Sequence, residues 1–259
     1  MKTADISVEY IQHTGSDLQV ANAARVSFDK VGEWEYDSEN PTICIESPHN
    51  GAGYTIVDPG VVRTLSEKDA KLIRYLAKHK HFSPFNHSFI TLRIKAPVFV
   101  ARQLVKHKFM PWNEVSRRYV DDEPEFYFPT LWRARADNVK QGSSELPAAY
   151  MQEEQWDGTE SINDTCTTEE LLYRDVRRVL GMYQDMVNNG VCAEQARMIL
   201  PQNMMTSWFW SGTLGAYADM LRLRLDPHTQ KESRDVAEQI NAIIEPLFPV
   251  ALPALLAIN

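Results

Sequence analysis

The segment 89–111 constrains the fold more than any other part of the chain. Over residues 89–95 apolar and polar side chains alternate, which predicts a β-strand with one buried face. Pro97 follows almost at once and suits the first turn of an α-helix, which we expect to continue to about Phe109. Pro111 ends that helix, so the polar residues after it are expected to form a loop. A strand that leads directly into a helix indicates a fold of mixed α and β class.

The rest of the chain adds a strand near its start and several helices toward its end. We expect an opening strand over residues 4–10. The aromatic run Trp208-Phe209-Trp210 is interpreted as core or subunit interface. Caps, breakers and helical spacing predict helices over residues 18–28, from Ser66 to the basic run at 78–81, from Thr168 to Gly190, over residues 193–200, through Tyr217 to Leu225, and from Asp226-Pro227 through Ile244. The predicted fold is therefore α/β (mixed α+β) with a helical C-terminal half.

Length and composition favour a single domain. A chain of 259 residues, 44% of them hydrophobic, can bury one generous core or two small ones. Two irregular or polar stretches, at about 30–64 and 133–168, are interpreted as surface insertions in one domain that spans residues 1–259. No GxGxxG follows a strand and no Walker loop is present, which excludes dinucleotide binding of the Rossmann or P-loop kind.

Charge, hydropathy and cysteine content exclude several classes of protein. No apolar run has membrane-spanning length, and residues 1–10 lack the apolar stretch of a signal peptide. Three cysteines without CxxC spacing predict reduced thiols and a cytoplasmic location, with Cys192 as a buried thiol. The formal net charge of -8 argues against nonspecific nucleic-acid binding. No metal site is predicted, because no acid or cysteine shares the spacing of His79, His81 and His87.

The acidic chain contains one strongly cationic segment. Residues 93–118 include seven lysines and arginines against a single acid, Glu114. Such a concentration predicts a site for an anion. Because the chain as a whole is acidic, the anion is expected to be small: a nucleotide, a phosphate or a phosphorylated cofactor.

Helix geometry adds further candidate ligand residues. On the expected helix Gln103, Lys106 and His107 lie at i, i+3 and i+4 and would share one face. Arg197 belongs to a short and largely apolar helix, where an unpaired guanidinium would be costly. We therefore expect Arg197 to meet an anion as well.

Motifs along nearly the whole chain, apart from the two insertions, indicate a family. In the cationic segment the residues at fixed offsets are His107, Asn113, Glu114, Ser116, Arg118 and Tyr119. This spacing resembles the signature of the flavin-dependent thymidylate synthases, the ThyX family. Six further blocks look like family blocks in family order: Ala23 to Asp29, His81 to His87, Lys95 to Gln103, Glu125 to Pro129, Ala196 to Asn203 and Leu223 to Glu232.

The resemblance implies an enzyme that reductively methylates dUMP to dTMP. Such an enzyme uses 5,10-methylenetetrahydrofolate as carbon donor, FAD as hydride carrier and NADPH as reductant. It assembles as a homotetramer with active sites between subunits. No protein nucleophile is needed in this interpretation, because the cofactor carries the difficult chemistry.

The resemblance also implies roles for individual residues. Ser116, Arg118 and Arg224 are the expected catalytic residues, and the two guanidiniums can stabilise enolate character at a ring carbonyl. Ser116 can also be a loop hydroxyl that only closes a turn. The expected nucleotide-binding residues are Gln103, Glu114, Ser116, Arg118, Arg197 and Arg224. The expected cofactor-binding residues are Ser27, His81, Ser83, Lys106, His107, Lys108, Glu114, Asp219, His228 and Gln230.

Six positions depart from the family pattern: Lys106, Lys108, Pro111, Thr213, Gly215 and Asp219. The first two replace arginines and lack their planar fork, Pro111 replaces a serine, and the last three replace Asn, Arg and Asn. A carboxylate at Asp219 only accepts hydrogen bonds, which suits the amine of cytosine better than O4 of uracil. Two alternatives therefore stay open: a ThyX-like flavin-dependent hydroxymethylase of dUMP or dCMP, and a catalytically silent flavin- or nucleotide-binding protein.

Overall fold

The computed structural model describes residues 1–37, 62–120, 122–137, 143–144, 147–148, 151–156 and 161–258. Helices and strands are both present there, and helices predominate in the C-terminal half, so the predicted α/β class is confirmed. Within these residues no helix combines the length and the apolar character that crossing a membrane requires.

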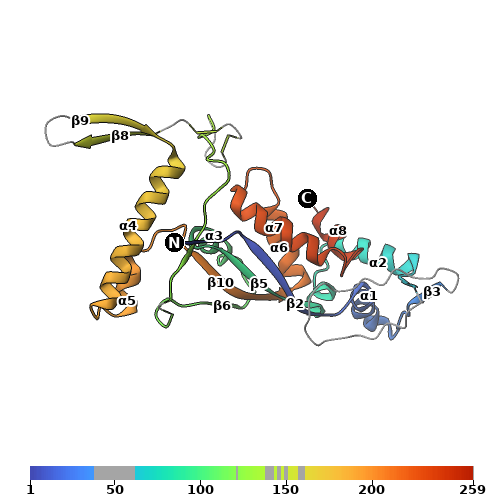
Figure 1. Cartoon of the computed structure of the whole chain (residues 1–259). Coiled ribbons are helices and arrows are strands. Elements are labelled where there is room, and N and C mark those ends of the chain that lie inside the picture. Colours follow the sequence, from blue (N-terminus) through green and yellow to red (C-terminus); the bar gives the residue numbers. More distant parts are fainter. Residues whose placement is uncertain are drawn as a thin grey trace.

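A four-stranded antiparallel sheet lies at the centre of the molecule (Figure 1). Its strand order is β2-β5-β10-β6, with β2 over Ser7–Thr14, β5 over Phe89–Pro97, β10 over Met205–Thr213 and β6 over Trp112–Glu114. The strand predicted at residues 89–95 is confirmed. The opening strand is also present, but it begins and ends later than predicted.

Alternation along the strands gives the sheet one apolar and one polar face. The register places Trp208 opposite Ile94 and Trp210 opposite Leu92, and all four side chains are buried. Phe209 lies between the two tryptophans on the other face and is 45% exposed. The tryptophans are therefore core residues, as predicted, but they belong to a central strand that the sequence analysis did not identify.

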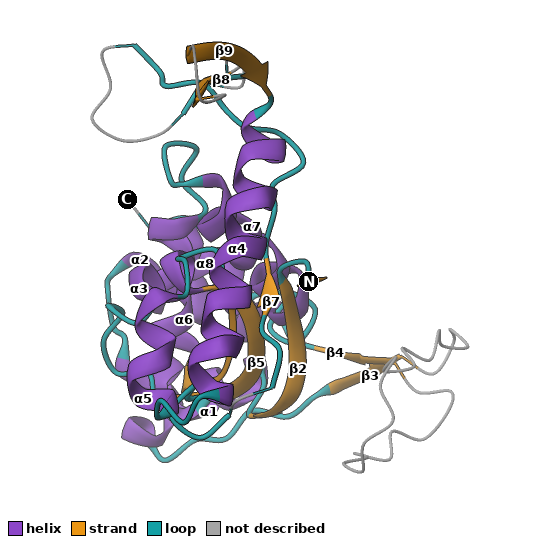
Figure 2. Cartoon of the chain, turned by 60° about the vertical axis from the view of Figure 1, so that its left-hand side comes forward, coloured by secondary structure: helices purple, strands orange, loops and turns teal. Residues whose placement is uncertain are grey.

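Helices cover the apolar face of the sheet (Figure 2). They are α1 over Asp17–Arg25, α2 over Glu67–Lys78, α6 over Leu214–Arg224, α7 over Lys231–Ile244 and α8 over Ala251–Leu256. On α7 the fully buried Val236, Ile240 and Ile244 form one stripe at i, i+4 and i+8. Burial of each such side chain stabilises the fold by roughly 1.5–3 kcal/mol.

A second, smaller core lies under the long helix α4, Thr168–Asn188. Val176, Leu180 and Tyr183 of α4 pack there with Phe126. The N-cap of α4 is Thr167, one residue before the predicted Thr168. At the other end Gly190 adopts a φ of 85°, which glycine tolerates without strain, and the helix stops as predicted. The short helices α5, Ala193–Ala196, and η3, Arg197–Ile199, follow.

The remaining elements are short. Strand pairs form between β1 (Lys2–Thr3) and β7 (Glu125–Phe126), between β3 (Glu35–Asp37) and β4 (Val62–Thr64), and between β8 (Met151–Trp156) and β9 (Ser161–Cys166). Two 3-10 helices complete the set, η1 over Val26–Phe28 and η2 over Ser83–His87. The structure describes only the two ends of the first predicted insertion, which pair as β3 with β4, but it describes most of the second, in which β8 pairs with β9.

The helix expected from Pro97 to Phe109 is shorter than predicted. It is α3, Val98–Leu104, and Pro97 is its N-cap. Phe109 has a φ of 61°, in the left-handed region, which an α-helix cannot contain. The chain turns here so that β6 can pair with β10, and the expected loop after Pro111 is therefore partly a strand.

Two further details differ from the expectations. The helix expected from Asp226-Pro227 is α7, which begins at Lys231 with Gln230 as N-cap. Cys192 is exposed, because it is the residue that precedes α5 at the surface. Its expected role as a buried thiol was wrong.

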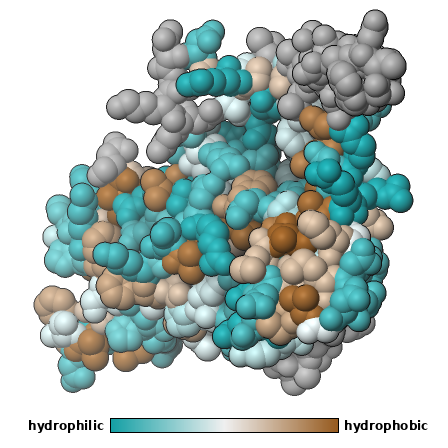
Figure 3. Space-filling view, turned by 90° about the vertical axis from the view of Figure 1, so that its left-hand side faces the viewer, coloured by the Kyte–Doolittle hydropathy of each residue, from teal (hydrophilic) through white to brown (hydrophobic). Residues whose placement is uncertain are grey.

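The face that carries α4 and α5 is partly apolar. Figure 3 shows hydrophobic patches among hydrophilic atoms on this side of the molecule. Exposed side chains from α4 and η3 include Tyr173, Met182 and Met198, with Met198 at 74% exposure.

Candidate functional site

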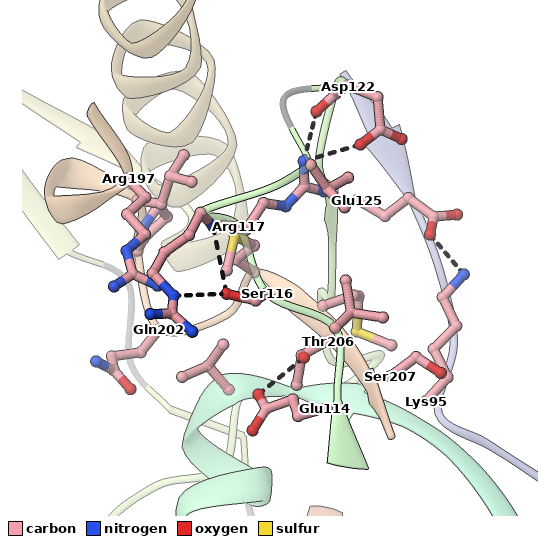
Figure 4. Close-up of a pocket in the computed structure, with 18 of the residues that line it drawn as sticks. Lys95, Glu114, Ser116, Arg117, Asp122, Glu125, Arg197, Gln202, Thr206 and Ser207 are labelled. Atoms are coloured by element: carbon pink, nitrogen blue, oxygen red, sulfur yellow. Dashed lines mark hydrogen bonds and ion pairs between the residues drawn. The ribbon is translucent and has the colours of Figure 1, made fainter. Parts of the chain in front are cut away.

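A cavity of about 1080 Å³ opens beside the polar face of the central sheet (Figure 4). Figure 4 shows Arg197 and Ser116 on one side, Glu114 and Thr206 at the floor, and Lys95 with Glu125 on the opposite side. Four of the six residues expected to bind a nucleotide line this cavity: Glu114, Ser116, Arg118 and Arg197. Its volume suits a ligand the size of a nucleotide.

Strand alternation builds the floor of the cavity. Because Leu92 and Ile94 of β5 point into the core, Arg93 and Lys95 must point to the opposite face. The register sets Arg93 opposite Glu9 of β2, and Lys95 opposite Ser207 of β10. One stretch of β5 therefore supplies both the hydrophobic core and the cationic floor.

Glu114 is held in a fixed orientation by two neutral donors. The Thr206 hydroxyl donates to its Oε1 at 2.9 Å, and the Trp112 indole donates to Oε2 at 3.1 Å. The Trp112 ring in turn stacks on the buried Trp208, with ring centroids 4.3 Å apart. No cation within the described residues pairs with Glu114, so the carboxylate can accept further hydrogen bonds from a ligand.

Ser116 and Arg118 form a local turn at the rim. The Ser116 hydroxyl accepts from the Arg118 backbone N–H at 3.4 Å and from Arg118 Nε at 3.2 Å. This is the turn-closing role that the sequence analysis left open for Ser116, and it also orients the Arg118 guanidinium. The Arg118 guanidinium lies 4.9 Å from the Tyr119 ring centroid.

The cavity contains more unpaired positive charge than negative charge. Lys95 pairs with Glu125 at 2.5 Å, and Arg117 pairs with Asp122 at 3.1 Å. The other cations at the cavity form no ion pair within the described part of the chain: Arg93, Arg102, Arg118 and Arg197. Three lining carboxylates, those of Glu9, Glu114 and Glu194, likewise form no ion pair within the described residues, so the surface keeps a small excess of positive charge, which suits a phosphate monoester.

Arg197 reaches this cavity for a different reason from the one expected. Its side chain is exposed on η3, and its Nε donates to the Glu194 carbonyl at 3.3 Å. The expectation that burial forces it to find an anion was therefore wrong. Its position at the cavity wall makes it a candidate phosphate ligand instead.

The remaining nucleotide-binding candidates, Gln103 and Arg224, lie in a second cluster at the C-terminal end of α3. Arg224 Nε donates to His107 Nε2 at 3.0 Å, and Arg224 also donates to the Gln103 carbonyl at 3.2 Å. The Gln103 side chain donates to Gln230. His107, Gln230, Gln103 and Arg224 therefore come together although α3 ends before His107.

His107 is electrically neutral. Burial chiefly, and the nearby Arg224 charge, lower the pKa of His107 to about 4, although Asp219 acts in the opposite direction. A guanidinium only donates, so the lone pair must be on Nε2 and the ring proton on Nδ1. His107 thus offers one N–H donor away from Arg224.

The other expected cofactor residues lie at several places. Lys106 and Lys108 are exposed and make no ion pair within the described residues. Asp219 pairs with Arg222 on α6. The exposed His228 lies with its Nδ1 3.0 Å from Asp226 Oδ1.

Ser27, His81 and Ser83 belong to neither cluster. They lie on η1, just before η2, and on η2, and all three are exposed. The His81 ring lies stacked with Tyr75 at a centroid distance of 6.4 Å. Within this chain they do not meet the other candidates.

Sequence reasoning missed some cavity residues. Arg93, Lys95 and Arg102 were counted as part of the cationic segment but were not named as ligand residues, and Thr206 was not considered. For the first two, alternation was the available signal, since the polar face of a strand has to face something other than the core. Thr206 carried no such signal, because its β10 strand was not predicted.

Two of the departures have a structural explanation. Thr213 is the N-cap of α6, accepting from the Ala216 N–H at 3.2 Å, and it donates to Asn86 Oδ1 at 2.8 Å. A Cβ added at Gly215 would lie 2.6 Å from the same Asn86 oxygen. A side chain at position 215 would therefore have to displace the end of the Asn86 side chain, which accepts the Thr213 hydrogen bond.

Comparison with known proteins agrees with this geometry. Residues 9–250 match the family described as "Thymidylate synthase complementing protein". A flavin-dependent thymidylate synthase of Thermus thermophilus is 36% identical over 247 residues, covering 95% of this chain and 74% of the relative. One from Thermosipho melanesiensis is 32% identical over 193 residues, covering 74% of this chain and 79% of the relative.

A solved structure is similar over the full length. It is a UMP/dUMP methylase, PolB, from Streptomyces cacaoi bound with 5-Br dUMP, and it is 25% identical with a TM-score of 0.72. The alignment covers 100% of this chain and 98% of that chain. With the matched signature, the phosphate-suited cavity and this similarity in sequence and fold, the chain belongs to the thymidylate synthase complementing protein family, which includes the flavin-dependent thymidylate synthases.

Proposed function

We propose that the protein is an enzyme that reductively methylates dUMP to dTMP. In this proposal 5,10-methylenetetrahydrofolate donates the carbon, a bound FAD carries the hydride and NADPH is the reductant. Membership of the family supports the reaction type. A nucleotide substrate is further supported by the structural relative, which is a UMP/dUMP methylase bound with a brominated dUMP.

The cavity is the observation that carries the proposal. A nucleoside monophosphate presents a dianionic phosphate and a neutral pyrimidine. The unpaired guanidiniums of Arg102, Arg118 and Arg197 supply the charge that a phosphate requires. Glu114 and Ser116 add fixed polar groups beside them, which suit the sugar or the base.

The flavin expected for the family fits the donors in the second cluster. Lys106 and Lys108 offer exposed ammonium groups, which suit the pyrophosphate of FAD. His107 offers its Nδ1–H, and Gln230 an amide N–H, which suit the carbonyl and ring-nitrogen acceptors of the isoalloxazine. The family arginine missing at Gly215 is one cation that this chain does not supply.

The residues of this chain bind, orient and stabilise charge in the proposed reaction. When bound, the flavin supplies the hydride and the redox chemistry. Arg118 holds the nucleotide and, with Arg224, stabilises negative charge on a pyrimidine carbonyl. His107 is neutral and donates a hydrogen bond without giving up a proton. The expected cofactor residues are divided among several places in this chain, and Ser27, His81 and Ser83 lie apart from the other candidates, so we also propose a homotetramer in which sites of different subunits join.

The exposed apolar side chains near α4 support assembly. Tyr173, Met182 and Met198 are exposed side chains of the kind that is often covered in an oligomer. We propose further that residues 1–259 act as one catalytic domain and that the enzyme is cytoplasmic, as its thiols and composition suggest.

A cytosine substrate is less well supported. That alternative rested on Asp219 as a free acceptor for an exocyclic amine. The Asp219 carboxylate accepts from Arg222 and lies on an exposed part of α6. Uracil is therefore the base that we propose.

Product analysis tests the proposed function. The purified protein is incubated separately with dUMP, UMP and dCMP in the presence of FAD, NADPH and methylenetetrahydrofolate, and the nucleotides are identified by mass spectrometry. We expect dTMP from dUMP, with NADPH bleaching the flavin absorbance. A hydroxymethylated product, product from dCMP alone, or nucleotide binding without turnover would each refute the proposal.

A further inference from the structure

A buried carboxylate lies behind the second cluster. Glu232, in the first turn of α7, is only 4% exposed. One nitrogen of the Arg133 guanidinium donates to both of its oxygens, at 2.8 and 3.0 Å. Arg133 also donates from Nε to the Ser143 hydroxyl at 2.7 Å. The start of the predicted insertion at 133–168 is thereby connected to α7.

Glu232 is hydrogen-bonded to the cluster through the Gln230 side chain. Gln230 Nε2 donates to Glu232 Oε2 at 3.1 Å, and Gln230 Oε1 accepts from Gln103 Nε2. The Ser233 hydroxyl donates to Gln103 Oε1 at 3.1 Å. Glu232, Gln230, Gln103 and Ser233 therefore form one continuous chain of hydrogen bonds.

The direction of this chain follows from the carboxylate. A carboxylate only accepts, so Gln230 must turn its amide nitrogen toward Glu232 and its oxygen toward Gln103. Gln103 must then turn its own nitrogen toward Gln230. Each amide nitrogen has two protons and uses one in the chain, so each glutamine keeps one N–H for a ligand.

We propose that Glu232 is a positioning residue that fixes the amide orientation of Gln230 and Gln103, so that both present N–H donors to the nucleotide and the flavin. This inference rests on the proposed function and on the expected role of Gln103 as a nucleotide ligand. Arg133 donates to the Glu232 carboxylate from the side opposite Gln230 and so holds the first member of the chain in place. Neither Arg133 nor Glu232 lines the cavity.

The substitution Glu232→Gln reverses the chain. The new amide must give its oxygen to Arg133, because a guanidinium cannot accept, and its nitrogen then faces Gln230. The side-chain amides of Gln230 and Gln103 then both rotate by half a turn. The Gln103 nitrogen donates to the Ser233 hydroxyl, which can accept as well as donate. The double variant Arg133→Met with Glu232→Gln removes the constraint, so the original direction becomes available again.

The matched control is Glu238→Gln on the same helix. Glu238 is exposed, and among the residues that the structure describes it pairs with Arg234 alone, at 3.5 Å. For dUMP binding to the holoenzyme, measured by calorimetry, we expect Glu232→Gln to weaken affinity roughly tenfold. The double variant should recover to within about threefold of wild type. Glu238→Gln should bind like wild type.

Two readouts separate this proposal from a purely structural role. If Glu232 served only the ion pair with Arg133, the double variant would bind as weakly as the single one, and the proposal would be wrong. Wild-type affinity in Glu232→Gln would equally overturn it. The double variant also changes stability. Thermal unfolding of each variant therefore shows whether the pattern of stability among the variants differs from the pattern of dUMP affinity.

A ligand-free readout keeps this test independent of the proposed function. In protein with 15N-labelled glutamine, the side-chain resonances of Gln230 and Gln103, assigned through Gln230→Met and Gln103→Met, should both shift in Glu232→Gln. Unshifted resonances would refute the orientation chain even in a protein that binds no dUMP. Failure of the wild type to convert dUMP would instead refute the proposed function alone.

Discussion

Arg224 donates a hydrogen bond from its Nε to Nε2 of His107 over 3.0 Å, and this contact determines which form of the histidine is present. Burial of the imidazole alone would favour the neutral form, and a cation at this distance favours it further. Because the contact holds Nε2 of the imidazole in place, it also orients the Nδ1–H donor on the opposite side of the ring.

The pH dependence of stability should reflect this neutral histidine. In the unfolded chain His107 takes up a proton near its ordinary pKa of about 6.5, whereas in the folded protein its pKa is about 4. Below a pH of about 6.5 the unfolded state binds more protons than the folded state. The stability that the neutral His107 contributes is therefore fully present above this pH and is lost as the pH falls toward the folded pKa of about 4. We expect urea midpoints to fall between pH 7 and pH 5, and the fall to be smaller in His107→Gln.

The half-buried His13 has a lowered pKa for the same reason, burial, and contributes to the same slope. The wild type and the variant share that contribution, so the difference between them reports His107. Equal slopes in the two proteins over this pH range would contradict the assignment of a neutral His107.

Arg118 and Arg117 provide a matched test of the cavity. Arg118 has no carboxylate partner in the described chain, whereas Arg117 pairs with Asp122 at 3.1 Å. Arg118→Ala should weaken dUMP binding by about 10- to 100-fold, the range for a lost charge-assisted hydrogen bond, and abolish methylation. It should leave flavin content intact. Arg117→Ala should change dUMP affinity far less, and titration calorimetry on both variants compares them. Equal losses would show that the charge of the cavity, and not this guanidinium, is what matters.

Lys108 should contribute to flavin binding through a screened contact. An exposed ammonium group near a phosphate attracts it strongly at low salt and weakly at high salt. Lys108→Ala is therefore expected to bind FAD several-fold more weakly than the wild type at low ionic strength. The FAD affinities of the wild type and the variant should converge as the salt concentration rises. Fluorescence titration of the apoprotein measures this. Lys78→Ala, at the exposed end of α2, is the control. If the ratio of wild-type to Lys108→Ala affinity for FAD stayed constant at every salt concentration, a role for the Lys108 charge would be contradicted.

Two glycines should respond in opposite ways to an added methyl group. Gly15 has a φ of 89°, and a Cβ there would lie 2.3 Å from the Ser88 hydroxyl oxygen. Gly181, within α4, has nothing within 4 Å of that position. Gly15→Ala should lower the free energy of unfolding by roughly 2–4 kcal/mol. Gly181→Ala should raise it by about 0.5–1 kcal/mol. Chemical denaturation measures both, and stabilisation by Gly15→Ala would contradict the described turn.

Local patterns predicted the elements that depend on local chemistry. Alternation identified the strand at 89–95 and the side chains it buries, and Gly190 marked the end of α4. The Ser66 cap is present, since its hydroxyl accepts from the Asp69 N–H at 3.0 Å. Each of these signals is contained in a few neighbouring residues.

Long-range pairing explains the errors. The helix after Pro97 ends at Leu104 because β6 must reach β10, a strand almost a hundred residues away in the sequence. For the same reason the cationic segment splits: Arg93, Arg102 and Arg118 line the cavity, whereas Lys106 and Lys108 do not. The concentration of charge was visible in the sequence, but its division between two sites depends on contacts that no local pattern contains.

The two faces of β5 have an evolutionary consequence. Arg93 and Lys95, at odd-numbered positions, line the cavity, and their even-numbered neighbours pack in the hydrophobic core. A mutation on the ligand side therefore alters substrate preference without repacking a single core side chain. Relatives of such a protein can diversify their chemistry while inheriting the same scaffold, and an engineer can randomise the first set of positions and leave the second untouched.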